Sequence, residues 1–215
     1  MKKRMIVRLT LCAAVVVAGP YQRLISQGAE KVELKPQLAA SLRVLTDSAK
    51  KLGLPTAPLT SKAVEGSAKG ADDARIVQVV GELLRSLASA RAALGASVSD
   101  AELLAGASAL QAGIGAQAMT DFHRELPKRN LVQPLVIAAD LVRRGVPANI
   151  AMNALAQAAR AHVEDDALAR MRADIARDVD SGMAARAATA TVFGRALEER
   201  GATLRLDQAP SRPPQ

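Results

Sequence analysis

Hydrophobic and polar positions between Gly53 and Leu94 repeat with the period of an α-helix. Apolar residues follow the spacing i, i+4, i+7, i+8, i+11 and i+18, namely Ile76, Val80, Leu83, Leu84, Leu87 and Leu94. The pattern predicts a long amphipathic helix that starts at a capping aspartate, Asp72 or Asp73. We expect Leu83→Asp to cripple folding and Arg75→Asp to do little, because only the first places an unpaired charge in the core.

A shorter helix is predicted before this long one, from about Ala57 to Lys69. Gly53 and Pro55 mark the turn that leads into it, because glycine accepts a left-handed backbone and proline disfavours helix in the residue before it. Gly70 has two interpretations. It either stops the short helix or, together with Ala63 and Gly66, allows a neighbouring helix to approach closely.

The same spacing predicts further helices on both sides of this unit. A first helix begins at Pro36 and carries a leucine stripe at positions 38, 42, 45 and 52. Residues 131–144 form the most apolar segment after the N-terminus, and we expect them to be a central helix with several neighbours and with Val136 on its apolar face. Later stripes are carried by Leu103, Leu104, Ala107, Leu110, Met119, Phe122, Leu168, Met171, Ile175, Val179, Val192, Phe193 and Leu197. The chain is therefore predicted to be all-α, with about nine helices.

Two parts of the chain resemble each other. The segment 143–147, Arg-Arg-Gly-Val-Pro, echoes 51–55, Lys-Leu-Gly-Leu-Pro, and an Asp-Asp-Ala triplet follows each of them at 72–74 and 165–167. Each triplet precedes a long amphipathic pattern. This self-similarity predicts a pseudo-repeat of stacked helical hairpins within residues 36–201, either a short α-solenoid or an irregular bundle.

The N-terminus has the pattern of a secretory signal. A basic start at Lys2 is followed by an apolar stretch, Met5 to Ala18, and small residues favour cleavage after Ala18. We therefore expect a signal peptide at 1–18, a linker at 19–35 and a periplasmic or secreted protein with a disordered tail at 202–215. Two alternatives stay open, an uncleaved anchor and lipidation at Cys12.

Composition limits the possible partners. Hydrophobic residues make up 49% of the chain and aromatic residues 1%, so the core must be aliphatic and rich in alanine. The formal charge is +8, and removal of Lys2, Lys3, Arg4 and Arg8 lowers it by 4 to +4. This modest excess, with so few aromatic residues for base stacking, argues against nucleic acid as a partner.

No residues combine into a pattern typical of catalysis or of a cofactor site. The chain contains two histidines, His123 and His162, and no Gly-x-Ser-x-Gly motif. Carboxylates follow His162 at 164–166, but acidic residues at a helix start are normally caps rather than metal ligands. Segment 66–70 lacks the spacing of a phosphate-binding loop. We therefore expect a protein that is not an enzyme and has no metal or cofactor.

Three segments of the sequence resemble a known group of proteins. The sequence GLP at 53–55, KAVEGSAKGADDARIVQVV at 62–80, and the turn at 145–147 resemble a group of uncharacterised, signal-bearing helical proteins of high-GC bacteria. The resemblance covers most of residues 36–200. It implies export and an all-α fold, and it implies no activity or ligand.

Two functional hypotheses follow from the sequence. The first is an exported, non-enzymatic helical scaffold that binds a protein partner or itself. The second is an electrostatic binder of an anionic envelope polymer or of lipid headgroups. The second would use a set of cations that we expect on one face, Lys62, Lys69, Lys128, Arg129, Arg143 and Arg144.

Overall fold

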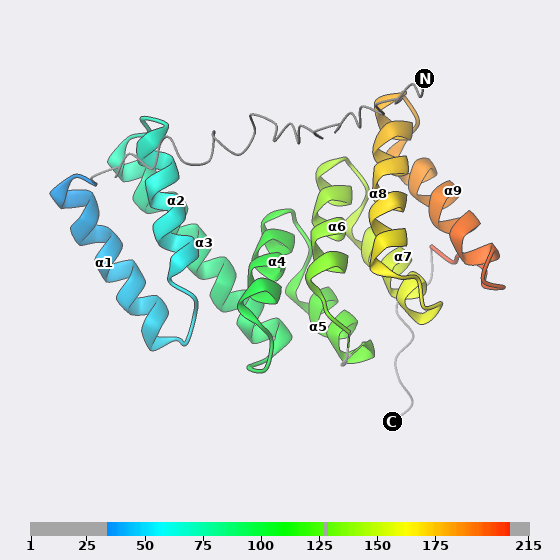
Figure 1. Ribbon diagram of the computed structural model, residues 1–215, viewed down its shortest axis with the longest axis horizontal. Helices are drawn as coiled ribbons and strands as arrows, with labels where there is room; N and C mark the ends of the chain where they lie inside the picture. Colours follow the sequence, from blue (N-terminus) through cyan, green and yellow to red (C-terminus); the bar gives the residue numbers. More distant parts are fainter. Residues whose placement is uncertain (1–33, 127–128, 207–215) are drawn as a thin grey trace, which may run out of the picture. The chain divides into compact units, whose positions relative to one another are not determined.

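The computed structural model describes residues 34–126 and 129–206, and these residues form nine α-helices and no strand (Figure 1). All of them belong to the unit from Leu34 to Gln215. The helices are α1 Pro36–Lys51, α2 Ala57–Ala68, α3 Asp73–Leu94, α4 Asp100–Gln111, α5 Ala116–Glu125, α6 Val132–Arg143, α7 Ala148–Arg160, α8 Asp165–Asp180 and α9 Ala185–Glu198. The prediction of an all-α fold is confirmed.

Each helix packs mainly on helices one or two places away along the chain. Helices α1, α3, α5, α7 and α9 contact one another in that order, and α4, α6 and α8 do the same. Helix α6 contacts α4, α7 and α8, as expected for the most apolar segment. Figure 1 shows α3 reaching from α1 and α2 towards α4 and α5.

Glycine turns end most of the helices. At Gly53 and Gly145 the backbone is left-handed, with φ of 62° and 93°. The next residue then donates its N–H back into the helix, Leu54 to the carbonyl of Ala49 at 2.9 Å and Val146 to that of Leu141 at 3.0 Å. Leu54 and Val146 are buried, so each turn also anchors an apolar side chain in the core.

The turn after α7 has the same hydrogen bonds but lacks glycine. Val163 donates to the carbonyl of Ala158 at 2.9 Å, and His162 holds the left-handed position with φ of 53°. His162 is the only residue other than glycine with positive φ in the described part of the chain. A Cβ is unfavourable in this conformation, so the turn stores strain.

The helix starts show where the two similar segments differ. Asp72 caps α3 and accepts hydrogen bonds from the N–H groups of Ala74 and Arg75, at 3.0 and 3.4 Å. In the second segment Asp165 is instead the first residue of α8, and the preceding Glu164 makes no capping hydrogen bond with its side chain. The Asp-Asp-Ala triplets therefore do not play the same structural role.

A capping box joins α4 to α6. Ser99 and Glu102 exchange hydrogen bonds at the start of α4, and a Glu102 carboxylate oxygen also accepts the N–H of Leu131 at 3.1 Å. Burial of Glu102 opposes ionisation, but the hydrogen bonds donated by Ser99 and Leu131 outweigh it and lower the pKa of this carboxyl group. One side chain therefore fixes the start of two helices that are distant in sequence.

The predicted stripes need four corrections, one of which is on α4, where Leu104 is 38% exposed. On α3, Ile76, Val80, Leu87 and Leu94 are buried, but Leu83 and Leu84 are half-buried, so we now expect Leu83→Asp to be less damaging than a change at Leu87. On α1, Leu52 is 57% exposed because the helix has ended and the chain turns away there. On α6, Val136 is 37% exposed while Ile137 is buried.

Each of the two interpretations of the small residues around α2 holds for a different glycine. No atom lies within 4 Å of a Cβ added at Gly70, so this glycine does not serve a close helix approach. Gly70 holds a left-handed turn, with φ of 69°, and so ends α2. Gly66 permits close packing of α2 on α3, because a Cβ at this position would lie 2.9 Å from Cγ1 of Ile76.

Candidate functional site

Two of the predicted binding cations lie on α2 and share one carboxylate. Lys62 pairs with Oε2 of Glu65 at 3.0 Å, and Lys69 pairs with Oε1 of the same residue. Hydrogen bonds from Lys69 and Lys62, with the positive charge of both, lower the pKa of Glu65 to about 2. These lysines are therefore partly neutralised within their own helix.

The other described cations are also engaged. Arg129 donates to the carbonyl of Val163 at 2.7 Å and pairs with Asp165 at 3.0 Å. Arg143 donates to Oγ of Ser108 at 2.9 Å.

Arg144 pairs with Asp140 at 3.2 Å and with Asp180 at 3.5 Å. Arg143 and Arg144 come together at the end of α6, whereas α2 does not pack on α6. Lys128 lies outside the described residues.

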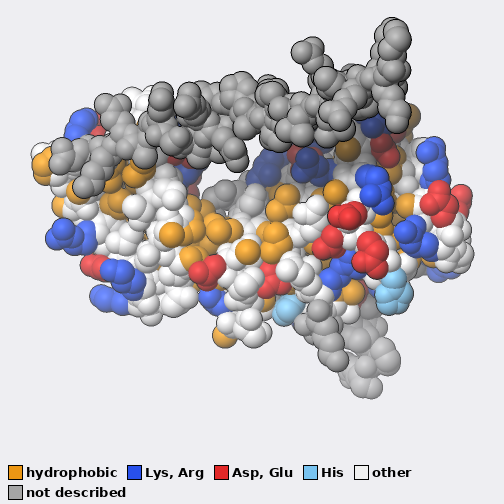
Figure 2. Space-filling view, in the orientation of Figure 1, with side chains coloured by type: hydrophobic (Ala, Val, Ile, Leu, Met, Phe, Trp, Pro, Cys, Tyr) orange, Lys and Arg blue, Asp and Glu red, His pale blue; other side chains and the backbone are white. Residues whose placement is uncertain are grey.

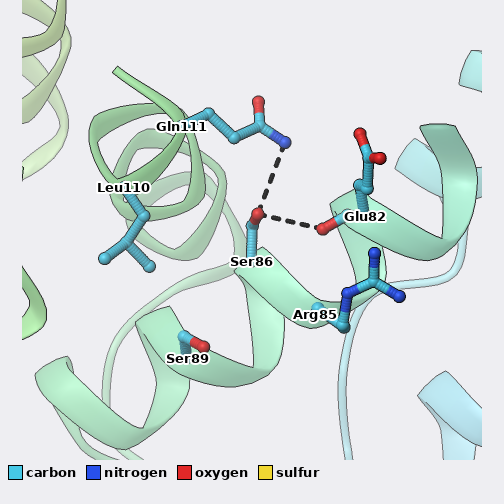
Figure 3. Close-up of a pocket in the computed structure, with 6 residues that line it drawn as sticks. All are labelled: Glu82, Arg85, Ser86, Ser89, Leu110 and Gln111. Carbon is cyan, nitrogen blue, oxygen red and sulfur yellow. Dashed lines mark hydrogen bonds between the residues drawn. The ribbon is translucent and has the colours of Figure 1, made fainter. Parts of the chain in front are cut away.

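An open hollow of about 340 Å³ lies between α3 and α4 (Figure 3). Its polar groups bond to one another, because Ser86 donates to the carbonyl of Glu82 at 2.9 Å and Gln111 donates to Oγ of Ser86 at 3.4 Å. The Ser86 hydroxyl thus points to a backbone carbonyl rather than to a base that could activate it. This arrangement has no features of a catalytic nucleophile.

A larger hollow of about 490 Å³ lies between α8 and α9 and is lined by charges of both signs. Arg170 and Arg195 face it together with Asp178 and Glu199, and Arg177 pairs with Asp174 at 2.9 Å. Figure 2 shows basic and acidic side chains interleaved over α6 to α9 on the face in view. A mixed surface of this kind does not select for one sign of ligand charge.

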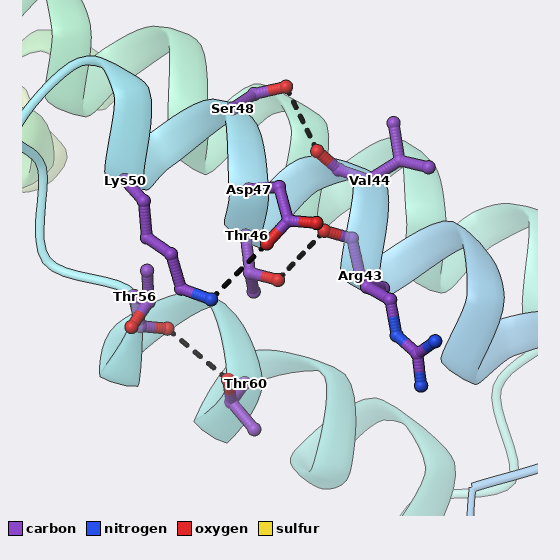
Figure 4. A network of polar contacts seen from close by, with 8 residues as sticks. All are labelled: Arg43, Val44, Thr46, Asp47, Ser48, Lys50, Thr56 and Thr60. Atoms are coloured by element: carbon purple, nitrogen blue, oxygen red, sulfur yellow. Dashed lines mark hydrogen bonds and ion pairs between the residues drawn. The ribbon is translucent and has the colours of Figure 1, made fainter.

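The outer side of α1 carries two exposed apolar residues, Val44 at 67% and Leu52 at 57%. The polar side chains around Val44 bond within α1 (Figure 4). Ser48 donates to the Val44 carbonyl at 2.9 Å, and Lys50 pairs with Asp47 at 3.2 Å. These groups do not converge on a common point, so they do not form a binding site for a small ligand.

Helix α7 presents a row of amide side chains. Asn149, Asn153 and Gln157 are four residues apart and therefore share one face, while most of the other side chains of α7 are buried. The amide of Gln157 donates to Oδ1 of Asn153 at 3.0 Å, which fixes the orientation of both groups. The side chain of Asn149, one turn before Asn153, makes no hydrogen bond to another described residue. We call Asn149, Asn153 and Gln157 the amide row.

The segment after α9 lies on this amide row. Gln157 donates to the carbonyl of Arg205 at 2.8 Å and accepts the N–H of Arg205 at 2.9 Å. Asn153 donates to the carbonyls of Arg205 and Leu206, at 2.8 and 3.1 Å. All these bonds use backbone atoms of the segment, so they impose no requirement on its side chains.

The segment 202–206 has the alternation of an extended chain. Ala202, Leu204 and Leu206 are half-buried, whereas Thr203 and Arg205 are exposed. Leu204 and Leu206 pack against the core. The predicted disorder of 202–215 is therefore wrong for residues 202–206, because the polar composition of the tail hid two apolar anchors. Residues 207–215 lie outside the described residues.

One turn of α7 is close in length to two residues of an extended chain. Four helical residues rise about 6 Å, and two extended residues span about 6.6 Å. The observed contacts advance by less than this, because Gln157 and Asn153 both bond to the Arg205 carbonyl and Asn153 also reaches that of Leu206. The segment therefore runs antiparallel to α7. The sequence carries a signal for this contact, namely amides at i, i+4 and i+8 in an alanine-rich helix and a Leu-x-Leu pair in a polar tail.

No protein-family model, curated protein sequence or solved structure matches this chain. Within the described ranges, no three His, Cys, Asp or Glu side chains gather as a metal site would require. The helices of this part of the chain are too short or too polar to cross a bilayer. The amide row on α7 is therefore the candidate site that the geometry supports best.

Proposed function

We propose that this protein is an exported, non-enzymatic helical scaffold that binds an extended segment of a partner protein along the amide row of α7. The observation that carries the proposal is the pair of hydrogen bonds between Gln157 and the backbone of Arg205. An amide that both donates to and accepts from one residue satisfies the backbone of a bound chain as a neighbouring strand would.

The amide row suits recognition of a backbone. Amide side chains carry a donor and an acceptor and no charge, so they replace the water around a peptide group without the cost of burying an ion. The apolar contacts of Leu204 and Leu206 supply the hydrophobic contribution to binding. From the sequence of the chain's own segment we infer that the partner has apolar residues at alternate positions.

The anionic-surface hypothesis has weaker support. Lys62, Lys69, Arg129 and Arg144 pair with carboxylates of this chain, and Arg143 donates to Ser108. An anionic polymer would have to compete with these contacts. We therefore favour a protein partner.

The proposal can be tested with a labelled peptide of residues 202–209, ATLRLDQA. The receptor is the full chain with Leu204→Asp and Leu206→Asp, which weaken the attachment of its own segment and which we call the opened chain. We expect the peptide to bind the opened chain, as measured by fluorescence anisotropy. Adding Gln157→Ala should weaken binding about tenfold, because two hydrogen bonds are lost. Gln111→Ala, which removes an amide on α4, is the matched control.

A second peptide separates backbone recognition from side-chain recognition. Methylation of the backbone nitrogen of Arg205 removes the donor to Gln157 and leaves the side chains unchanged. We expect a loss of at least threefold in affinity. Absence of binding to the opened chain, or equal affinity for both peptides, would refute the proposed function.

Export is tested separately. We expect the mature protein in the periplasm or medium to begin at Gly19, after cleavage behind Ala18. Mass spectrometry of the purified protein identifies its first residue. Recovery of the chain from the cytoplasm with Met1 in place would argue against export.

A further inference from the structure

The bound segment leaves part of its site unfilled. A hollow of about 220 Å³ lies where the segment leaves α9, and it is lined by Gln157, Arg160, Ala161, Leu197, Ala202 and Thr203. Leu197, Ala161 and Ala202 make it partly apolar. In the alternation of the segment the inward positions are Ala202, Leu204 and Leu206, so the smallest of the three side chains lies at the hollow.

The chain cannot adjust this end of the segment freely. Ala202 donates its N–H to the carbonyl of Leu197 at 2.9 Å, the last hydrogen bond of the turn that ends α9. Gly201 holds the left-handed position of this turn, with φ of 70°. The covalent link to α9 therefore fixes Ala202, whereas a separate peptide has no such constraint.

We infer that the amide row selects a segment of the pattern Φ-x-Leu-x-Leu, in which Φ is a large apolar residue at the position of Ala202, and that the chain's own segment is a weaker internal ligand that such a partner displaces. This inference rests on the proposed function and names its ligand. Selectivity comes from the hollow, because the hydrogen bonds to the amide row are the same for every sequence.

The chain's own segment competes with any external ligand for the amide row. A segment joined to α9 has a high effective concentration at the amide row, so an external peptide with the same contacts competes poorly. A partner that also fills the hollow gains buried apolar surface that the internal segment lacks. The chain's own segment thus favours partners with the full pattern over other extended chains.

The test compares peptides on the opened chain defined above, with Gly201→Pro added. Proline cannot take the left-handed position at 201, so this change releases Ala202 from its place beside Leu197 and leaves that place free for a peptide. One peptide carries the native residues 202–209, and the second carries Ala202→Leu. We expect the second to bind about tenfold more tightly, because its added carbons are buried in the hollow. A third peptide with Arg205→Leu is the control, and it should match the native one because this side chain is exposed and does not line the hollow.

A change in the receptor identifies the hollow as the cause. Ala161→Leu in the opened chain should remove the advantage of the Ala202→Leu peptide and leave the affinity for the native peptide within about twofold. Its helical content and melting temperature are measured first, and Ala161→Met replaces it if the leucine impairs folding. In the chain with its own segment intact, the Ala202→Leu peptide should bind more weakly than in the opened chain.

Equal affinity of the native and Ala202→Leu peptides would overturn this inference and leave the proposed function standing. The same holds if the advantage survives both changes at Ala161. No binding of either peptide would refute the proposed function, and the inference with it.

Discussion

Helices α1 and α7 lie in the same series of contacting helices but present opposite kinds of surface. On α1, Val44 and Leu52 are exposed and apolar, while the nearby polar groups bond within the helix. On α7, the amide row is covered by residues 202–206 of the same chain. Apolar contacts with Val44 and Leu52 would not orient a ligand, because they are not directional. The hydrogen bonds of the amide row do orient the backbone that lies on it.

The difference follows from the position of each helix. Helix α1 packs mainly on α2 and α3, and Val44 on its other side is exposed. Helix α7 packs on α5, α6 and α9, which leaves a narrow polar strip uncovered by helices. The comparison teaches that the informative surface is the one where polar groups align between neighbours, and not the one with the most exposed apolar area.

The largest expected effect separates the inner and outer sides of α1. Leu38 is buried and Val44 is exposed, and both lie on the same helix. We expect Leu38→Asp to lower the free energy of unfolding by at least about 3 kcal/mol, because the charge would enter the core without a partner. Val44→Asp should change it by less than about 0.5 kcal/mol. Urea denaturation of both variants measures this, and similar losses would contradict the assignment of the two sides.

The packing of residues 202–206 on the amide row of α7 should contribute to the free energy of unfolding, and the exposed apolar residues of α1 should not. The double substitution Leu204→Ala and Leu206→Ala should lower the free energy of unfolding by about 1–2 kcal/mol, since both side chains are half-buried. The matched pair Val44→Ala and Leu52→Ala should cost less than about 0.5 kcal/mol. Hydrogen exchange at Arg205 gives a local readout, because its N–H donates to Gln157. Unprotected exchange there in the unchanged chain would show that the segment is not held on α7.

Substitutions in the turns that follow α1 and α7 should change the stability of the protein in opposite directions. Gly53 after α1 and His162 after α7 both hold the left-handed position. We expect Gly53→Ala to destabilise by about 1 kcal/mol, since no atom lies within 4 Å of the added Cβ and only backbone strain changes. His162→Gly should stabilise by up to about 1 kcal/mol, reduced by the greater freedom of glycine in the unfolded chain. Thermal unfolding tests both, and a loss of stability on His162→Gly would indicate a contact of the imidazole that outweighs the strain.

The sequence predicted the fold well because local signals decide it. The glycine turns at 53 and 145, the cap at Asp72 and the Pro36 start were all readable from residue type and spacing. The helical period did not predict that Leu52 is exposed, because the helix ends one residue earlier. Nor did it distinguish Val136 from Ile137, because burial depends on which neighbours contact α6.

The candidate site was far less predictable. Positive charges in the sequence suggested the cations of α2 and α6, but pairing with Glu65, Asp140 and Asp180 depends on side-chain positions that spacing gives only within one helix. The amide row was visible as a spacing. Its meaning depended on a contact between residues about 50 positions apart, Gln157 and Arg205, which a single sequence does not reveal.

The smallest expected effect concerns the exposed pairs on α2, the neighbour of α1. The lysines Lys62 and Lys69 hold the pKa of Glu65 at about 2, against a usual value of 4.5. Since the folded-state pKa is the lower one, the stabilisation is complete above about pH 4.5 and is lost as the pH falls towards 2. The effect is small because Glu65 is exposed to solvent, and 1 M salt should weaken it further. Lys62→Ala with Lys69→Ala should move the carboxyl titration, followed by carbon NMR, back towards 4.5. Lys51→Ala removes one charge from α1 and should leave the titration unchanged, so an equal shift in this control would show that general charge, and not pairing, sets the pKa of Glu65.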